Sequence, residues 1–462
     1  MSTGPLPPGR LLSWYGDDFT GSAAVMEVLS FGGIEAVLFL DPPTPEQLDA
    51  FSHCRAVGIA GVARSQTPDW MDQNLPPIFR TLAGLKAPIA HYKICSTFDS
   101  SPSIGSIGHA VDLAAPILGG RWHPMLVAAP PIARYQAFGN LFATVDGTTH
   151  RLDRHPVMSR HPVTPMGEAD VRAHLSRQTG RPTGLVDLLA LRSSDGARDR
   201  LAAQMSSDRP VIAIDAIDEA DLVAAGRLIW EQRGEKLLAI GSQGVEYALL
   251  AYWRAGGALP PADPPGSAGP VDQIIVVSGS VSETTARQIA WSADNGFALV
   301  PFDAASVVDD ASLHSACEAA VSAAATALSS GRSVLVHSAR GPDDPAVEGF
   351  RRAVGGASMP LAEANSRVGA ALGRILDRLL HLTGLSRAVI SGGDTSGHAA
   401  LQLGVHALTA LAPTIQGAAL CQAHGAGRPN LQLALKGGQM GSPDYFGWIR
   451  NGGGPRRTDL SP

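Results

Sequence analysis

The chain has 462 residues, more than one ordinary hydrophobic core accommodates, so we expect two domains. Apolar residues make up 45% of the chain and charged residues 17%, a composition typical of globular proteins with a substantial interior. The net charge of −6 comes from interspersed acids and bases, which argues against nucleic acid or an anionic membrane surface as a partner.

Targeting signals and cysteines bear on the compartment. No stretch reaches the roughly 20 uncharged apolar residues that a membrane-spanning helix needs. Pro and Gly stand where a signal peptide would have its apolar core. The four cysteines, Cys54, Cys95, Cys317 and Cys421, lie far apart without paired spacing. We therefore expect reduced thiols in a cytoplasmic protein.

Short apolar runs alternate with Ala- and Leu-rich helical patterns along the chain. The runs occupy residues 10–15, 36–40, 56–61, 124–129, 210–215, 236–241, 273–279, 333–339 and 387–393. Runs of this length without strict polar alternation suit strands that are covered by helices on both faces. The sequence therefore predicts an α/β fold with two domains, each a mainly parallel sheet flanked by helices.

A Pro- and Gly-rich stretch separates the two halves of this pattern. Residues 255–270 read AGGALPPADPPGSAGP, a composition that disfavours both a helix and a sheet ladder. We predict a first domain over residues 10–254, a linker over 255–270 and a second domain over 271–450. The stretch 148–163 has no clean period and is predicted to be a long loop.

Two adjacent acids, Asp17 and Asp18, end the first apolar run. A helical pattern with Thr20 as its expected cap follows them and stops at Gly32 and Gly33. A buried Asp pair needs cations, amides or a ligand to compensate it. One carboxylate would accept from helix amides, and the other would take a proton from a substrate hydroxyl or help hold a hydrated metal ion. The alternative is a solvated turn in which both acids are caps.

The second half repeats this arrangement at three strand ends. The three turns contain Ser278 and Ser280 (before a helix capped by Ser282), Gly392 to Thr395, and Lys436 to Gly438. Glycines allow close approach to the backbone, and free amides at a helix start suit phosphate oxygens. Three such turns predict a nucleotide site. Neither a Walker A loop nor the dinucleotide fingerprint Gly-x-Gly-x-x-Gly is present, which disfavours a dehydrogenase.

Five segments resemble the four-carbon acid sugar kinases. They are DDFTG at 17–21, GSQG at 241–244, VVSGSVSETTARQI at 276–289, SGGDTSG at 391–397 and LKGGQMGSPDYF at 435–446. The resemblance covers nearly the whole chain with its motifs in the family's order. It implies an N-terminal domain for a sugar acid and a C-terminal domain for ATP, with Mg²⁺ assisting and the active site in the cleft between the domains.

The candidate residues follow from these motifs together with the strand ends. On the sugar-acid side they are Asp17, Asp18, Arg64, Lys93, Ser96 and Arg134, and on the nucleotide side Ser278, Ser280, Gly392, Gly393, Asp394, Thr395, Lys436, Gly437 and Gly438. One acid of the Asp17–Asp18 pair would orient or deprotonate the attacking hydroxyl. Asp394 would hold Mg²⁺ or activate the hydroxyl instead, and both roles stay open. The sequence is compatible with a monomer and with a homodimer.

One segment departs from the family. Most members read Lys-x-x-Ser-Thr-x-Arg-Gly-Asn here, whereas this chain keeps Lys93, Ser96 and Thr97 but has FDSS at 98–101. The loss of a guanidinium favours a 3-oxo sugar acid, such as 3-oxo-isoapionate or a 3-oxo-tetronate, over threonate or erythronate. A non-catalytic sensor of sugar acids and nucleotides is the remaining alternative.

Overall fold

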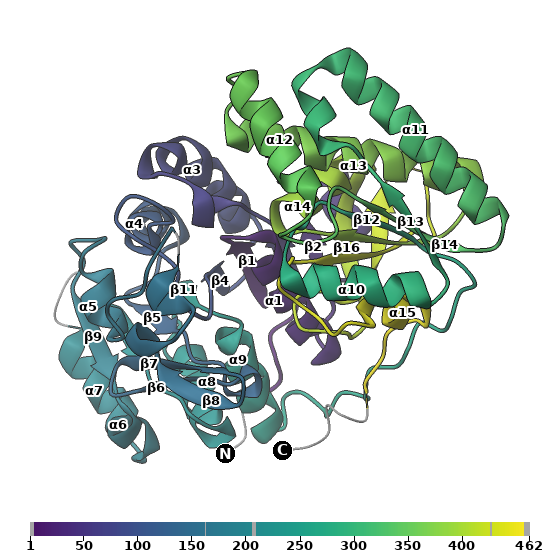
Figure 1. Ribbon diagram of the computed structural model, residues 1–462. Coiled ribbons are helices and arrows are strands. Elements are labelled where there is room, and N and C mark those ends of the chain that lie inside the picture. The colour runs from purple at the N-terminus through teal and green to yellow at the C-terminus, as the bar shows by residue number, and fades with distance from the viewer. Residues whose placement is uncertain (1–3, 162, 206–208, 426, 457–462) are drawn as a thin grey trace. The chain divides into compact units, whose positions relative to one another are not determined.

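The computed structural model describes residues 4–161, 163–205, 209–425 and 427–456. The chain divides into two compact units, Met1–Asp263 (unit 1) and Pro264–Pro462 (unit 2), and each is described by itself (Figure 1). Residues 256–274 contain neither helix nor strand. In the described part of the chain, no helix combines the length and apolar character needed to span a bilayer.

Unit 1 is built on a parallel sheet. The strands, in their order across the sheet, are β2 (Ala36–Phe39), β3 (Ala56–Ile59), β1 (Leu12–Gly16), β4 (Ile89–Lys93), β11 (Leu237–Gly241), β5 (His123–Leu126), β10 (Val211–Ile214) and β9 (Thr183–Val186). A small antiparallel sheet contains β6 (Arg134–Ala137), β7 (Asn140–Val145) and β8 (Thr148–Arg151). Most strands of the large sheet are buried along their whole length, as the uninterrupted apolar runs predict.

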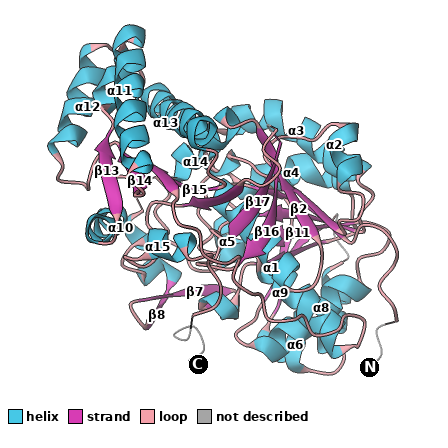
Figure 2. Ribbon diagram, turned by 90° about the vertical axis from the view of Figure 1, so that its right-hand side faces the viewer, coloured by secondary structure: helices cyan, strands magenta, loops and turns pink. Residues whose placement is uncertain are grey.

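Helices flank this sheet, as Figure 2 shows by colour. They are α1 (Phe19–Phe31), α2 (Pro45–Ala50), α3 (Pro68–Gly84), α4 (Ile107–Leu118), α5 (Val171–Leu175), α6 (Leu188–Arg192), α7 (Gly196–Gln204), α8 (Glu219–Glu231) and α9 (Gly244–Ala255). Trp14 fixes α1 against β1, because its buried indole donates to the carbonyl of Ser22 at 3.2 Å. Gly58 of β3 lies in register with Trp14, and a Cβ there would come within 2.0 Å of the ring.

Two local predictions were wrong. Helix α1 begins at Phe19 and is capped by Asp18 rather than Thr20, because the Asp18 carboxylate accepts from the amide of Gly21. The predicted loop over 148–163 contains β8, a hairpin partner of β7, followed by two short 3₁₀ turns. The hairpin is held by cross-strand pairing, which hydrophobic periodicity does not report.

Unit 2 has a mainly parallel sheet of its own. Its strands, in order, are β13 (Phe297–Pro301), β14 (Ser333–His337), β12 (Ile275–Ser278), β15 (Arg387–Ser391), β18 (Gln432–Lys436), β17 (Leu420–Gly425) and β16 (Val405–Ala412), and only the β18–β17 and β17–β16 pairs are antiparallel. Its helices are α10 (Glu283–Asp294), α11 (Asp310–Ser329), α12 (Pro345–Gly356), α13 (Leu361–Thr383), α14 (Gly393–Gln402) and α15 (Tyr445–Arg450).

Helices cover both faces of the unit 2 sheet, with α10 and α15 on one side and α11 and α13 on the other (Figure 1). On the first face, the strand residues in the core with these two helices include Val276, Leu335, Val389 and Ala434. Because side chains alternate along a strand, the residue two positions later in each strand points to this same face. That later position is the last residue of each strand, at the carboxyl edge of the sheet.

Candidate active site

The turn from β1 to α1 positions the two acids of unit 1. The backbone amide of Asp17 donates to the carbonyl of Lys93 at 2.9 Å, which extends the pairing of β1 with β4 by one residue. Asp18 has extended backbone angles and caps α1, with its Oδ1 2.9 Å from the amide of Gly21. The hydroxyl of Ser22 donates to the carbonyl of Asp18 at 2.6 Å. The sequence thus fixes both carboxylates at the carboxyl edge of the sheet.

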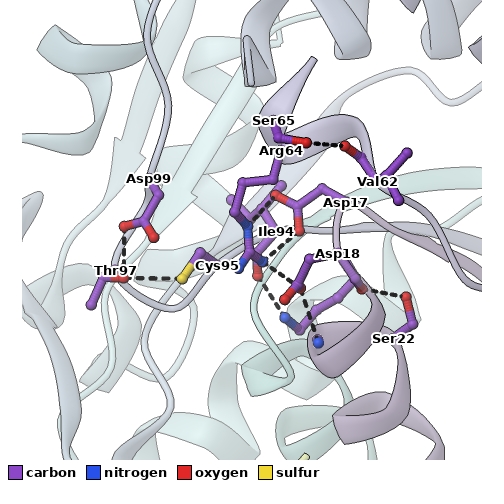
Figure 3. Close-up of polar contacts among 12 residues, drawn as sticks. Asp17, Asp18, Ser22, Val62, Arg64, Ser65, Ile94, Cys95, Thr97 and Asp99 are labelled. Carbon is purple, nitrogen blue, oxygen red and sulfur yellow. Dashed lines mark hydrogen bonds and ion pairs between the residues drawn. The ribbon is translucent and has the colours of Figure 1, made fainter. Parts of the chain in front are cut away.

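Arg64 neutralises both acids (Figure 3). It lies on the 3₁₀ turn Ala63–Ser65, whose amide at Arg64 donates to the carbonyl of Asp17 at 2.9 Å. Its Nη2 and Nε bond the two oxygens of Asp17 at 2.6 and 3.2 Å, and Nη2 also reaches Asp18 Oδ1 at 2.6 Å. This shared guanidinium explains how adjacent acids are tolerated at a buried turn.

The two carboxylates differ in their surroundings. The side chain of Asp17 is 2% exposed, whereas that of Asp18 is 28% exposed. Burial raises the pKa of the Asp17 carboxyl, and the charge of Asp18 adds to this, although Arg64 opposes it. Both bonds of Asp18 use Oδ1, so among the described residues its Oδ2 has no partner. Asp18 is therefore the acid with an oxygen available to a ligand.

Lys93 brings a second cation to this turn. It is the last residue of β4, it is buried, and its ammonium donates to the carbonyl of Ile94 at 2.7 Å. A Cβ on Gly21 would lie 2.8 Å from Lys93 Nζ and 2.4 Å from Asp18 Oδ1. Gly21 is thus required where the cation and the acid converge on the start of α1. Asp17, Asp18, Arg64 and Lys93, all predicted from the sequence, form one cluster.

Arg134 is the other predicted cation of unit 1. Its Nη1 donates to the carbonyls of Ile132, Ala133 and Thr144 at 3.1–3.4 Å. Its Nε is buried and has no partner among the described residues. Burial lowers the pKa of the Arg134 guanidinium, whereas its electrostatic interactions with Cys95 and Asp99 raise it. Arg134 therefore lies near the loop after β4, where Ser96 is half-buried.

Four polar residues form a row across the carboxyl edge of the unit 2 sheet. His337, Ser278, Ser391 and Lys436 are in register on neighbouring strands, and all are buried. Both ring nitrogens of His337 and the hydroxyls of Ser278 and Ser391 have no partner among the described residues. Such unpaired buried groups each cost about 1–3 kcal/mol, so we expect water or a ligand to pair with them.

Lys436 supplies the charge of this row. Its ammonium donates to the carbonyls of Gly437 and Met440 at 2.9 and 3.3 Å. Burial lowers the pKa of Lys436 to about 8, and burial with the charge of Arg340 lowers the pKa of His337 to about 4. At neutral pH the row therefore combines a cation with an uncharged imidazole. The position of His337 at the end of an apolar strand makes it a candidate for nucleotide contact from the sequence alone, whereas Ser391 was missed although it ends an apolar strand in the same way.

The other predicted residues of unit 2 lie on the adjoining turns. Gly438 is held against α10, because its carbonyl accepts from Ser282 and Thr285 at 2.5 and 3.0 Å. A Cβ on Gly438 would lie 2.5 Å from the hydroxyl of Ser280. Ser282 caps α10 as predicted.

The start of α14 includes the remaining nucleotide candidates. Gly392 precedes this helix with φ +134°, a backbone conformation that favours glycine. Gly393, Asp394 and Thr395 form the first turn of α14, and the side chains of Asp394 and Thr395 lie outside the described part of the structure. No group of three potential metal ligands occurs among the residues that are described.

These features define a class of protein. Unit 1 presents acids and cations at the edge of a parallel sheet, and unit 2 presents glycine turns beside a buried cation. Residues 12–249 match the model of a sugar-binding N-terminal domain, and residues 275–446 match that of a nucleotide-binding C-terminal domain. The chain belongs to the four-carbon acid sugar kinase family.

Individual relatives extend this result. A 3-oxo-isoapionate kinase of Paraburkholderia graminis is 50% identical over 448 residues, which are 96% of this chain and 95% of that protein. A 3-oxo-tetronate kinase of Pseudomonas savastanoi pv. phaseolicola is 30% identical over 448 residues, 94% of this chain and 96% of that protein. Haemophilus influenzae protein HI1011 superposes with a TM-score of 0.70 at 21% identity over 95% of this chain and 99% of that chain, a likeness in fold.

Proposed function

We propose that this protein is an ATP-dependent kinase that phosphorylates a hydroxyl of a 3-oxo sugar acid, with 3-oxo-isoapionate as the preferred substrate. The similarity to the Paraburkholderia graminis kinase extends over 96% of the chain and supports this substrate. The observation that the proposal depends on most is the cluster of Asp17, Asp18, Arg64 and Lys93, in which Asp18 Oδ2 is available beside two cations.

In the proposed mechanism, the attacking hydroxyl of the sugar acid donates its hydrogen bond to Asp18 Oδ2. The hydroxyl oxygen forms a bond to the γ-phosphorus, and the bond from this phosphorus to the β–γ bridging oxygen breaks. ADP leaves with that electron pair, and the hydroxyl proton moves to Asp18. Arg64 keeps Asp17 and Asp18 in place, and Lys93 stabilises negative charge as it develops. Ser96 is also proposed to contact the sugar acid.

Arg134 is proposed to bind the substrate carboxylate. Arg64 is already paired with two acids, so its charge is compensated within the protein. The Nε of Arg134, by contrast, has no partner among the described residues and is suited to a carboxylate oxygen. Lys93 has one carbonyl partner, and its charge would add to the attraction of the substrate carboxylate by Arg134.

The nucleotide is proposed to bind unit 2 at the start of α14 and the Gly437–Gly438 turn. Gly392, Gly393 and Thr395 would approach its phosphates, and Ser278, Ser280 and Lys436 would complete the site. The unpaired hydroxyl of Ser278 and the uncompensated charge of Lys436 support this assignment.

Mg²⁺ is proposed to accompany ATP, with Asp394 as the protein ligand. Mg²⁺ commonly keeps several waters and takes one or two carboxylates plus phosphate oxygens, so a single acid of the chain fits it. The ion would neutralise the phosphate charge. We further propose that the protein works in the cytoplasm, in agreement with the wide spacing of its four cysteines in the sequence, and that neither nucleic acid nor membrane takes part.

ADP release tests the function. The enzyme would be mixed with ATP, Mg²⁺ and one of four acids: 3-oxo-isoapionate, 3-oxo-tetronate, threonate or erythronate. We expect the highest kcat/KM with 3-oxo-isoapionate. A higher kcat/KM with one of the other acids would make that acid the preferred substrate. Calorimetric binding without any ADP release would favour a sensor.

A further inference from the structure

The loop after β4 is held in a strained conformation beside the acid cluster of unit 1. Phe98 has φ +58° and is fully buried, and its amide donates to the carbonyl of Cys95 at 3.0 Å. A bulky residue with positive φ costs free energy and persists only where its surroundings fix it. Here the ring of Phe98 packs edge-on against His174, with the ring centroids 5.4 Å apart.

The two serines after Asp99 anchor this loop. The Ser100 hydroxyl donates to the carbonyl of Phe98 at 3.0 Å, accepts from the amide group of Gln178 at 2.9 Å and lies 3.0 Å from His174 Nε2. Ser101 donates to the carbonyl of Ile104 at 3.1 Å. Both hydroxyls are therefore already hydrogen-bonded to other groups of the protein. Of the three residues at which this chain departs from the family pattern, Asp99 alone has a side chain available to a ligand.

The carboxylate of Asp99 is only partly satisfied. Its Oδ1 accepts from the hydroxyl of Thr97 at 2.8 Å, and Thr97 in turn lies 3.0 Å from the sulfur of Cys95 (Figure 3). Its Oδ2 has no hydrogen-bond partner among the described residues. Asp99 is half-buried, so its side chain keeps some exposure and Oδ2 remains an acceptor for a ligand.

Arg134 is the cation that interacts with Asp99 without bonding to it. The two side chains interact electrostatically, yet the hydrogen bonds that Arg134 makes to the described residues go to backbone carbonyls. Cys95 interacts electrostatically with Arg64, Asp99 and Arg134, which places its thiol among the three. A ligand that contacts both side chains would therefore meet one acid and one cation.

We propose that Asp99 is a specificity-determining residue that accepts hydrogen bonds from the branch hydroxyl of a branched 3-oxo sugar acid. This inference rests on the proposed kinase function and deepens it. The negative charge of Asp99 repels the substrate carboxylate, which therefore binds to Arg134. A linear four-carbon acid has no branch hydroxyl and gains little from Asp99.

The test compares Asp99→Asn with the wild-type enzyme on two acids. The replacement has the same shape and keeps an acceptor for Thr97, but it removes the charge. We expect kcat/KM for 3-oxo-isoapionate to fall by about 10- to 100-fold, mainly through KM, because a hydrogen bond to a charged acceptor is lost. The value for 3-oxo-tetronate should change less than about threefold, and the KM for ATP should not change. Asp218→Asn, which alters the Asp218–Arg192 ion pair elsewhere in unit 1, is the matched control and should affect neither acid.

Equal losses with both acids would overturn the inference, because a general disturbance of the loop would produce them. The inference would also be overturned if Asp99→Asn kept full activity and the wild-type ratio of the kcat/KM values for the two acids. Calorimetric titration of the full chain with 3-oxo-isoapionate in the absence of ATP separates this inference from the kinase function. Weaker binding by Asp99→Asn would support the specificity role even if no ADP formed, and equal binding would contradict it.

Discussion

Replacing Arg64 with Met should destabilise unit 1 strongly and in a pH-dependent way. The substitution keeps a long side chain but leaves Asp17 and Asp18 without their shared guanidinium. Two opposite charges about 4 Å apart interact with roughly 4 kcal/mol at an effective dielectric constant of about 20. The bidentate pair with the buried Asp17 accounts for most of the effect, since the pair with the more exposed Asp18 is screened by solvent.

We therefore expect Arg64→Met to lower the free energy of unfolding at pH 7.5 by about 3–5 kcal/mol, the cost of breaking a buried ion pair. At about 2–4 °C per kcal/mol for a unit of this size, the melting temperature should fall by roughly 6–20 °C. The matched control is Arg181→Met, whose ion pair with Asp112 is more exposed. That control should cost about 1 kcal/mol or less.

The pH dependence follows from the sign of the Asp17 shift. Burial raises the pKa of Asp17 in the folded protein, and Arg64 normally opposes this rise. Without Arg64 the pKa rises further, so the folded variant binds a proton at a pH where the unfolded chain has released it. Its stability must then increase as the pH falls toward that pKa. Urea unfolding at pH 5 and pH 7.5 should show a smaller loss at pH 5, and an equal loss at both values would refute this reasoning.

Three further predictions concern other residues. Because burial lowers the pKa of Lys436 to about 8, its ammonium loses its charge between pH 7 and 9. Calorimetry should therefore show that ATP affinity falls over this pH range in the wild type and stays constant in Lys436→Met. A constant ATP affinity in the wild type would contradict this. Gly438→Ala should weaken ATP binding without affecting the sugar acid, since the new Cβ would come within 2.5 Å of Ser280 Oγ, and unchanged nucleotide affinity would count against it. Glu246→Ala should lower the free energy of unfolding by about 3–5 kcal/mol, more than Glu246→Gln, because the buried Glu246 bonds His91 at 2.7 Å; a urea midpoint of Glu246→Ala equal to that of the wild type would show that this pair is not needed.

Local sequence patterns were sufficient for many of the strands and for part of the site, although β9, β13, β16 and β17 were not among the predicted runs. The apolar runs predict the α/β fold because strands covered on both faces need no polar alternation, and β1 ends at the acids as expected. Asp17 and Asp18 are neighbours in sequence, so the sequence alone was enough to assign both acids to one turn. Ser282 was identified as a cap for the same reason, since its partner Thr285 is three residues away.

Non-local geometry could not be predicted in this way. Arg64 is 47 residues from Asp17, and its bonds to both acids follow only from the order of β3, β1 and β4 in the sheet. The polar row of unit 2 depends on the register of four strands, so the sequence offered Ser278, His337 and Lys436 as isolated candidates and missed Ser391. The sequence indicated that one of the two acids accepts from helix amides, but it also offered Thr20 as the cap, because both residue types favour that position.

The central claim is that Asp18 takes the hydroxyl proton during phosphoryl transfer, and a single-turnover experiment on Asp18→Asn tests it most directly. Enzyme in excess over radiolabelled ATP would be mixed with 3-oxo-isoapionate and quenched, after calorimetry has shown that both ligands still bind. We predict that transfer slows by about 10²- to 10⁴-fold while the Kd of ATP stays within about threefold of the wild-type value. A transfer rate within about tenfold of the wild-type rate would contradict the assignment of Asp18.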